Sequence, residues 1–170
     1  MNTRLTVRQA DPGDTPHILH IYNQGIEDRI AILETEQKDA AYMDAWFREH
    51  QGRYPVLVAE AAGEVIGWAS LNPYSHRCAY NGVADLSVYI ERSFRGQGVG
   101  GALLLALEKL AVQQKFNKIV LFTFPFNEGG QGLYRKLGYR QVGIFEKQGL
   151  MNGAYVDVMI MEKLLYRLNL

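Results

Sequence analysis

The sequence predicts a mixed α/β fold, in which a central and mostly antiparallel sheet carries helices on its faces. Short apolar runs, some alternating with polar residues, are typical of strands, whereas longer segments with apolar residues at every third or fourth position are typical of helices. The predicted elements follow in the order β-α-α-β-β-β-α-β-α-β-β. Antiparallel strands come first and a strand–helix–strand crossover follows, which favours a mixed sheet over a purely parallel one.

The first third of the chain predicts one strand and two helices. Residues 5–8 alternate between apolar and polar side chains, as in a short strand. Thr15 and Pro16 are typical of an N-cap followed by proline at the first helical position, and apolar residues then recur at helical spacing to about Glu27. The same spacing predicts a second helix over 40–50.

The middle of the chain predicts three strands. Residues 56–60 and 65–71 are apolar runs separated by the turn sequence Ala-Gly-Glu at 62–64, which indicates an antiparallel hairpin. A loop follows, and then a third strand is expected over 84–90. On that strand Asp85 shares one face with the next-but-one residues, because side chains alternate along a strand.

The last third opens on a glycine-rich stretch and contains the crossover. A long apolar segment after the glycines predicts a helix, and the apolar run that follows it predicts a buried strand. The glycine at 138 is typical of a helix end. The expected elements are a helix that follows the glycines and ends at about Lys115, a strand at 119–124, a helix at 127–137, and strands at 139–145 and 155–161.

Composition limits the possible functions of the 170 residues. Lys plus Arg and Asp plus Glu each total 18, and this zero net charge argues against nucleic acid as the main partner. The single cysteine, Cys78, excludes an internal disulfide and fits a reducing compartment. No apolar stretch reaches the ~20 residues of a membrane span, and the start has no signal-peptide core. We expect one cytoplasmic domain over 1–170, with no metal, membrane or nucleic-acid partner.

The glycines between Gly96 and Gly101 predict an anion site. They follow a strand and open a helix, whose N-terminal N–H groups favour a phosphate or pyrophosphate, with Arg95 and Arg92 nearby. The alternative is that they only shape a tight turn. The spacing also matches the dinucleotide fingerprint G-x-G-x-x-G, but Leu121 stands where that motif expects an acid, and the preceding strands are antiparallel.

Two motifs resemble the GNAT superfamily of N-acetyltransferases. One is Arg95-x-x-Gly98-x-Gly100, which resembles the acyl-CoA pyrophosphate loop of that family. The other is Asn127, then Tyr134 before a Leu-Gly-Tyr end at 137–139. The resemblance implies a GNAT-like acyl-CoA N-acyltransferase fold with acetyl-CoA as co-substrate. The cofactor-binding residues it implies are Leu86, Val88, Ile90, Arg95, Gly96, Gln97, Gly98, Val99, Gly100, Gly101 and Asn127.

Further segments resemble the phosphinothricin and methionine sulfone acetyltransferase branch of that family. They are Ile21-Tyr22-Asn23, Arg77-x-Ala79-Tyr80 and the stretch 87–90. The branch usually has Glu at the position of Asp85 and His at the position of Tyr134, so this chain departs from it twice. The resemblance implies direct transfer of an acetyl group to the amino group of a small amino-acid-like substrate, and a homodimer.

Roles follow for the polar residues of these motifs. Asp85 is the candidate base that deprotonates the amine, directly or through water, because an amine attacks only when neutral; otherwise it caps a loop or pairs with an arginine. Tyr134 is the candidate proton donor to the leaving thiolate, or a packing residue. Asn127 binds the pantetheine arm or simply caps a helix. Arg77 and Tyr80 bind a substrate carboxylate, or lie in a solvated loop.

Four hypotheses remain open at this point. The first is the amino-acid acetyltransferase described above. The second is an acetyltransferase of the same fold for another amine, such as a polyamine, an antibiotic or a protein N-terminus. The third is a non-catalytic CoA-binding module, which the departures at Asp85 and Tyr134 favour. The fourth is a nicotinamide-dependent oxidoreductase, which the context of the glycines disfavours.

Overall fold

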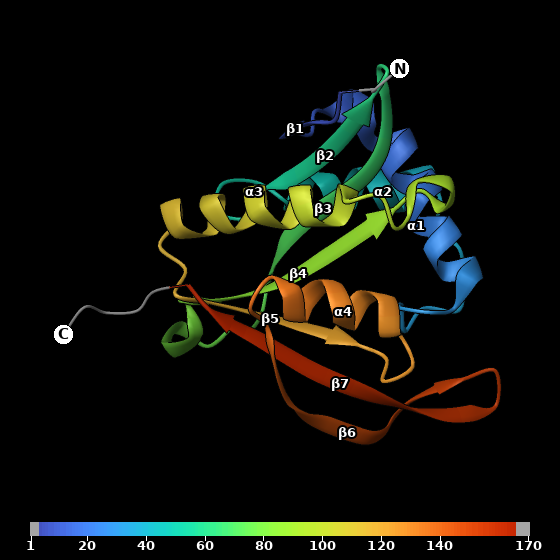
Figure 1. Ribbon diagram of the computed structural model, residues 1–170, viewed down its shortest axis with the longest axis vertical. Coiled ribbons are helices and arrows are strands. Elements are labelled where there is room, and N and C mark those ends of the chain that lie inside the picture. The colour runs from blue at the N-terminus through green and yellow to red at the C-terminus, as the bar shows by residue number, and fades with distance from the viewer. Residues whose placement is uncertain (1–3, 166–170) are drawn as a thin grey trace.

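The computed structural model describes residues 4–165 and has the predicted order of elements (Figure 1). The helices and strands, with three short 3-10 turns, are β1 (Thr6–Gln9), η1 (Pro12–Asp14), α1 (Thr15–Asp28), α2 (Ala40–Glu49), β2 (Val56–Ala61), β3 (Glu64–Pro73), η2 (Cys78–Tyr80), β4 (Val83–Ile90), η3 (Arg92–Phe94), α3 (Val99–Gln113), β5 (Lys118–Thr123), α4 (Glu128–Lys136), β6 (Arg140–Met151) and β7 (Ala154–Leu164).

The strands form one seven-stranded sheet in the order β1-β2-β3-β4-β5-β7-β6. All neighbouring pairs are antiparallel except β4 and β5, which are parallel and joined by the crossover helix α3. A parallel pair needs such a crossover, because the chain must return to the same edge before the second strand begins. The mixed, mostly antiparallel sheet predicted from the sequence is confirmed.

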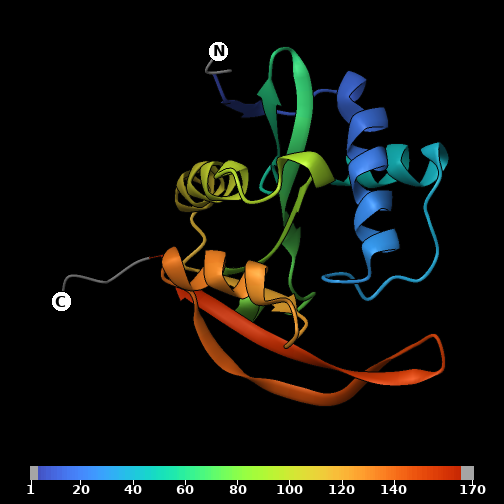
Figure 2. The same ribbon diagram turned by 45° about the vertical axis from the view of Figure 1, so that its right-hand side comes forward.

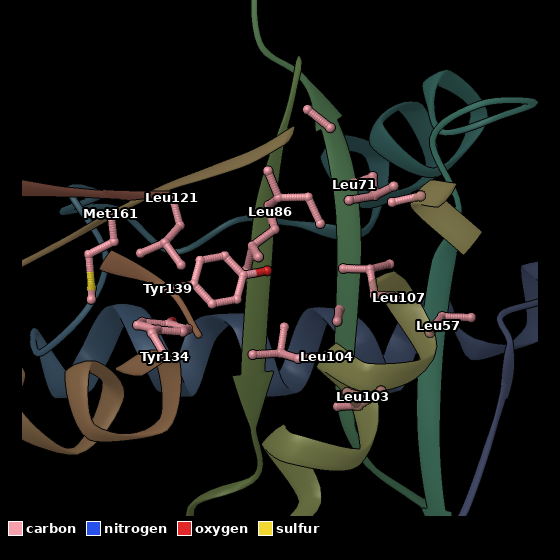
Figure 3. Close-up of a cluster of buried hydrophobic side chains, with 14 of the residues drawn as sticks. Leu57, Leu71, Leu86, Leu103, Leu104, Leu107, Leu121, Tyr134, Tyr139 and Met161 are labelled. Carbon is pink, nitrogen blue, oxygen red and sulfur yellow. The ribbon is translucent and has the colours of Figure 1, made fainter. Parts of the chain in front are cut away.

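Helices cover both faces of the sheet and divide the core in two (Figure 2). On one face α1 and α2 bury Ile18, Ile21 and Met43 against Val58 and Trp68. On the other face α3 and α4 cover the larger cluster, in which leucines of α3 meet leucines of β2, β3 and β4 (Figure 3). Burial of these apolar side chains on two faces is what fixes the strand order.

The sheet opens between its two parallel strands. β4 and β5 pair only from Val83 opposite Lys118 to Asp85 opposite Val120. Beyond Asp85 the two strands diverge, and the rest of β4 has hydrogen-bonded partners on its β3 side alone. The divergence leaves this part of β4 without a strand partner on its β5 side. It contains Leu86, Val88 and Ile90, which the resemblance implied bind the cofactor.

The hairpin of β6 and β7 is longer than predicted. The apolar pattern predicts a strand that ends at residue 145, whereas β6 continues to Met151, and the chain turns at Asn152 and Gly153, both of which have positive φ. The register shifts between Phe145 and Gly149, and Lys147 adopts a φ of 50° with its N–H bonded to Asp157 Oδ1 at 2.7 Å. This bulge interrupts the alternation of side chains on which strand prediction depends.

Candidate active site

The main cleft lies where β4 diverges from β5. Its volume is about 580 Å³, and its walls come from the last residues of β4, the glycine segment, the start of α3, one face of α4 and the end of α1 with the residues after it. Most of the predicted cofactor-binding residues line it: Val88, Ile90, Arg95, Gly96, Gly98, Val99, Gly100, Gly101 and Asn127. The cleft therefore joins the two motifs, which are far apart in the sequence.

Different structural requirements explain why glycine occupies several positions of the cleft. Gly96 and Gly98 have φ values of +75° and +84°, a backbone conformation that other residues rarely adopt, and Gly98 is the N-cap of α3. At Gly100 a Cβ would lie 2.8 Å from Leu133 Cδ2, so its glycine lets α3 and α4 pack closely. The N–H groups at the start of α3 fit a pyrophosphate, because the first turn of a helix leaves them without partners in the helix and they lie at its positive end.

Arg95 reaches the cleft but is held by an acid. Its guanidinium lies 2.6 Å from Asp28 Oδ2, and its Nε donates to the carbonyl of Ile90 at 3.2 Å. Arg92 binds the same carboxylate at 2.7 Å. The hydrogen bonds from Arg92 and Arg95 lower the pKa of Asp28. Asp28 itself lines the cleft and was not identified from the sequence.

Asn127 caps α4 at the edge of the cleft. Its Oδ1 accepts from the N–H of Gly130 at 3.1 Å, and its Nδ2 donates to Thr123 Oγ1 at 3.0 Å. Both ends of the amide are thus used within the protein. Two of the glycines of α4, Gly129 and Gly130, line the cleft, which fits a ligand that approaches the helix backbone closely.

Asp85 lines a second, smaller hollow of about 160 Å³ beside the main cleft. Burial raises the pKa of its carboxyl to about 7, although hydrogen bonds from the Asn72 side chain and the N–H of Leu86 favour the ionised form. Leu86 lines this hollow rather than the main cleft, with side chains such as Phe122 and Phe124. A carboxyl group that titrates near neutral pH can act as a general base.

Tyr134 lies on α4 and lines the main cleft. Its ring packs edge-on against Tyr139, with centroids 6.0 Å apart. Burial and the nearby negative charge of Asp85 raise the pKa of its hydroxyl to about 12, so it stays protonated at neutral pH. The candidate proton donor and the candidate base thus lie close enough for the charge of one to shift the pKa of the other.

Three predicted residues lie outside both hollows. Gln97 is in the glycine segment, but its side chain donates to the carbonyl of Ser93 at 3.0 Å. Arg77 and Tyr80 lie in the exposed loop before β4, where Tyr80 packs against Tyr74 with centroids 6.1 Å apart. Their assigned roles stay predictions.

Residues missed by the sequence analysis complete the smaller hollow. The segment between α1 and α2 contributes Ala31, Ile32 and Leu33 to it. No periodic pattern in the sequence singles out these three residues. Among residues 4–165 there is no cluster of three or more His, Cys, Asp or Glu side chains arranged to hold a metal. No helix in that range is long and apolar enough to cross a membrane.

The diverging strands, the glycine segment and the Asn–Tyr helix define an acyl-CoA-type acyltransferase, and comparison with known proteins agrees. The model of the acetyltransferase (GNAT) family matches residues 19–139. The chain therefore belongs to this family, and the family predicted from the two motifs is confirmed.

Individual relatives are similar over nearly the whole chain. The L-methionine sulfoximine/L-methionine sulfone acetyltransferase of Pseudomonas aeruginosa is 36% identical over 160 residues, 92% of each chain. The phosphinothricin N-acetyltransferase of Streptomyces viridochromogenes is 30% identical over 91% of this chain and 84% of its own. A crystal structure of the phosphinothricin acetyltransferase of Sinorhizobium meliloti with acetyl-CoA has a TM-score of 0.88 and 28% identity, and covers 94% of this chain and 88% of that one.

Proposed function

We propose that this protein is an acetyl-CoA-dependent N-acetyltransferase of a small amino-acid-like amine of the phosphinothricin, methionine sulfone or methionine sulfoximine type. The observation that carries the proposal is the position of Asp85. It is the last residue of β4 that pairs with β5, and it lines the small hollow beside the cleft that contains both family motifs. The two relatives compared over more than nine-tenths of this chain act on such amines by name, which supports the substrate class.

The residues of the site have complementary roles in this reaction. Asp85 takes a proton from the substrate ammonium group, directly or through a water molecule, because Asp is one methylene shorter than Glu. The neutral amine then attacks the thioester carbonyl in a ternary complex. Tyr134 donates a proton to the leaving thiolate. N–H groups of residues 96–101 and the free main chain of β4 bind and orient the co-substrate.

The amine pocket is the small hollow. At about 160 Å³, and with both polar and apolar side chains in its walls, it suits a short side chain better than a long peptide. Arg77 and Tyr80 bind the substrate carboxylate in this proposal, since their loop leads directly into β4 and Asp85. We expect Arg77→Ala to raise the KM for the amine and to leave that for acetyl-CoA unchanged.

A thiol-release assay with acetyl-CoA tests the function. We expect turnover with methionine sulfone or phosphinothricin and much weaker turnover with spermidine, aminoglycosides or a peptide N-terminus. Turnover confined to those other amines would favour the second acetyltransferase hypothesis instead. Tight binding of acetyl-CoA without turnover on any amine would show a CoA-binding module.

We further propose that residues 1–170 form one domain, that it works in the cytoplasm and that it dimerises through the β6–β7 hairpin. Large apolar side chains of this hairpin are exposed, which supports a partner surface. They are Val142, Ile144, Phe145, Leu150 and Tyr155. Light scattering of the purified protein should give twice the 19.2 kDa chain mass.

A further inference from the structure

A polar network on the α1/α2 face of the sheet links Asp85 to His50. Asn72 is the cross-strand partner of Asp85 and bonds its carboxyl group. The Oδ1 of Asn72 lies 2.9 Å from Ser70 Oγ and 2.8 Å from His50 Nε2. Its Nδ2 donates to Ser87 Oγ at 3.0 Å. One amide thus contacts the candidate base on one side and an imidazole on the other.

The second ring nitrogen of His50 restricts this network. Nδ1 lies 2.8 Å from the carbonyl oxygen of Trp46, and the ring lies against the Trp46 indole, tilted by 35° with centroids 4.1 Å apart. A carbonyl only accepts hydrogen bonds, so Nδ1 carries a hydrogen. In the neutral ring Nε2 then accepts, and the Asn72 amide must present its NH₂ group to it. In the imidazolium Nε2 donates, and the amide must present its oxygen.

The charge of the His50 imidazole therefore sets the orientation of the Asn72 amide, and that orientation decides which amide atom faces Asp85. We propose that His50 is a positioning residue: when protonated it holds Asn72 with Nδ2 toward Asp85, and when neutral it turns the amide oxygen toward Asp85. The first orientation stabilises the carboxylate by a hydrogen bond, and the second favours the protonated acid, which can donate to that oxygen. The inference rests on the proposed function only for the role of Asp85 as base.

This coupling links the uptake of the substrate proton by Asp85 to the release of a different proton from His50 to water. When Asp85 takes a proton from the ammonium group, its O–H favours the amide oxygen and Asn72 turns. His50 Nε2 then loses its proton to water, and the ring lines an open hollow of about 320 Å³ on the side remote from the cleft. One proton enters from the amine and one leaves to water, and none passes through the amide.

Other titratable side chains face the two ends of the network. Tyr89 of β4 and Tyr134 of α4 face Asp85, and burial raises the pKa of both, so both stay neutral. Asp11 and Tyr54 line the hollow beside His50. These last two can affect the charge of the imidazole, so each experiment keeps them native.

Two substitutions of His50 test the proposal in the free protein. His50→Phe keeps a ring on Trp46 but removes both hydrogen bonds, and His50→Gln keeps a donor toward Asn72. The measurement is the carboxyl ¹³C titration of Asp85, assigned with Asp85→Asn. We expect His50→Phe to raise the pKa of Asp85 by about one, a tenfold loss of ionised base at a given pH, and His50→Gln to restore most of it.

Controls separate positioning from a general structural effect. His17→Gln changes an exposed histidine of α1 and should leave the Asp85 titration as it is. In an Asn72→Leu background, His50→Phe should cause no further change in the Asp85 titration, since His50 acts through that amide. In the native protein, the side-chain amide signals of Asn72 should change with the same midpoint as His50.

The outcomes distinguish this inference from the proposed function. An Asp85 titration that is the same in His50→Phe and the native protein would overturn the coupling, as would Asn72 amide signals that do not change with pH. The second measurement needs no variant and so remains decisive if His50→Phe fails to fold. Neither uses substrate, so a coupling seen without acetylation of any amine would overturn the proposed function alone.

Discussion

At the scale of single residues, Asp85 combines two features that a base of this kind needs. It is buried enough for its pKa to rise to about 7, yet it lines a hollow where an amine can reach it. We expect Asp85→Asn to lower kcat at least about 100-fold, the usual contribution of a general base, and to abolish the rise of kcat/KM with pH through about 7. Steady-state rates measured from acidic to alkaline pH across that midpoint would check this.

The conservative control for this prediction is Asp85→Glu. It restores the residue that the resembled branch usually has and keeps a carboxylate, so it should retain most activity. Full activity of Asp85→Asn across the pH range would instead show that the amine is deprotonated without Asp85.

Tyr134 carries the second prediction at this scale. Because its pKa is raised to about 12, its hydroxyl keeps a proton that it can donate. We expect Tyr134→Phe to reduce kcat by about 10- to 100-fold with little change in either KM. Tyr139→Phe is the matched control, because that ring packs against Tyr134 but lines neither hollow. Equal losses in both variants would assign Tyr134 to packing.

At the scale of elements, the end of α1 places a carboxylate beside the arginines of the proposed anion site. Asp28 binds both Arg92 and Arg95, so its carboxylate offsets one of the two positive charges beside the glycine segment. We expect Asp28→Asn to tighten acetyl-CoA binding by about 3- to 10-fold, because the arginines then face the phosphates, and to increase the salt dependence. Calorimetry at two salt concentrations would measure it.

Glu27→Gln is the control for Asp28. Glu27 is next to Asp28 on α1 and half exposed, and of the two arginines it contacts only Arg92, at 3.3 Å. Its other carboxylate oxygen accepts a hydrogen bond from Gln37 at 2.6 Å. Its substitution should change the affinity less than twofold, since exposed pairs contribute little. Weaker binding in Asp28→Asn would mean that Asp28 positions the arginines rather than competing for them.

Sequence patterns were sufficient to predict most helices and strands, together with the glycine segment and the position of Asp85 in the candidate site. Helical spacing in α1 and α3 and alternation in β4 are local signals, so these elements, the glycine segment and the face of Asp85 could be predicted. The end of β6 could not, because the bulge near Lys147 breaks the alternation. The side-chain amide of Asn127 serves as a helix cap, one of the two interpretations that the sequence left open.

Contacts between residues that are far apart in the sequence could not be predicted from local sequence patterns. Asn72 lies opposite Asp85 only through the register of β3 and β4, and His50 reaches Asn72 only because α2 ends over that strand. Likewise the pairing of Asp28 with Arg95 joins the end of α1 to the segment before α3. Such contacts depend on register and packing, neither of which one sequence specifies.

At the scale of the whole molecule, the net charge is zero, but individual carboxylates lie in opposite environments: some are paired with arginine, and Asp85 is buried. Carboxylates such as Asp14 are stabilised by arginine: the side-chain hydrogen bonds of Arg8 lower the pKa of Asp14. Asp14 therefore contributes stability above its unfolded pKa of 3.8, and this is lost as the pH falls. The contribution of Asp85 to stability depends on pH in the opposite direction, because the pKa of this residue in the folded state is raised from 3.8 to about 7.

This opposite pH dependence gives a prediction for stability. The folded protein binds the Asp85 proton more tightly than the unfolded chain, so ionisation of Asp85 costs stability progressively from about pH 4 to about pH 7 and by a constant amount above it. A pKa difference of one between the folded and unfolded states corresponds to ~1.4 kcal/mol, so the rise at Asp85 sets an upper limit of ~4 kcal/mol on this cost.

Asp85→Asn removes the charge of the side chain and keeps its shape. We expect it to be more stable than the native protein by about 2 kcal/mol at about pH 8 and by almost nothing at about pH 4. Urea unfolding of both proteins at these two values and at one between them would measure this, and an equal difference throughout would mean that Asp85 is not held at a raised pKa. A variant that is both inactive and more stable at the alkaline end would show that the sheet gives up stability at this position to keep a base.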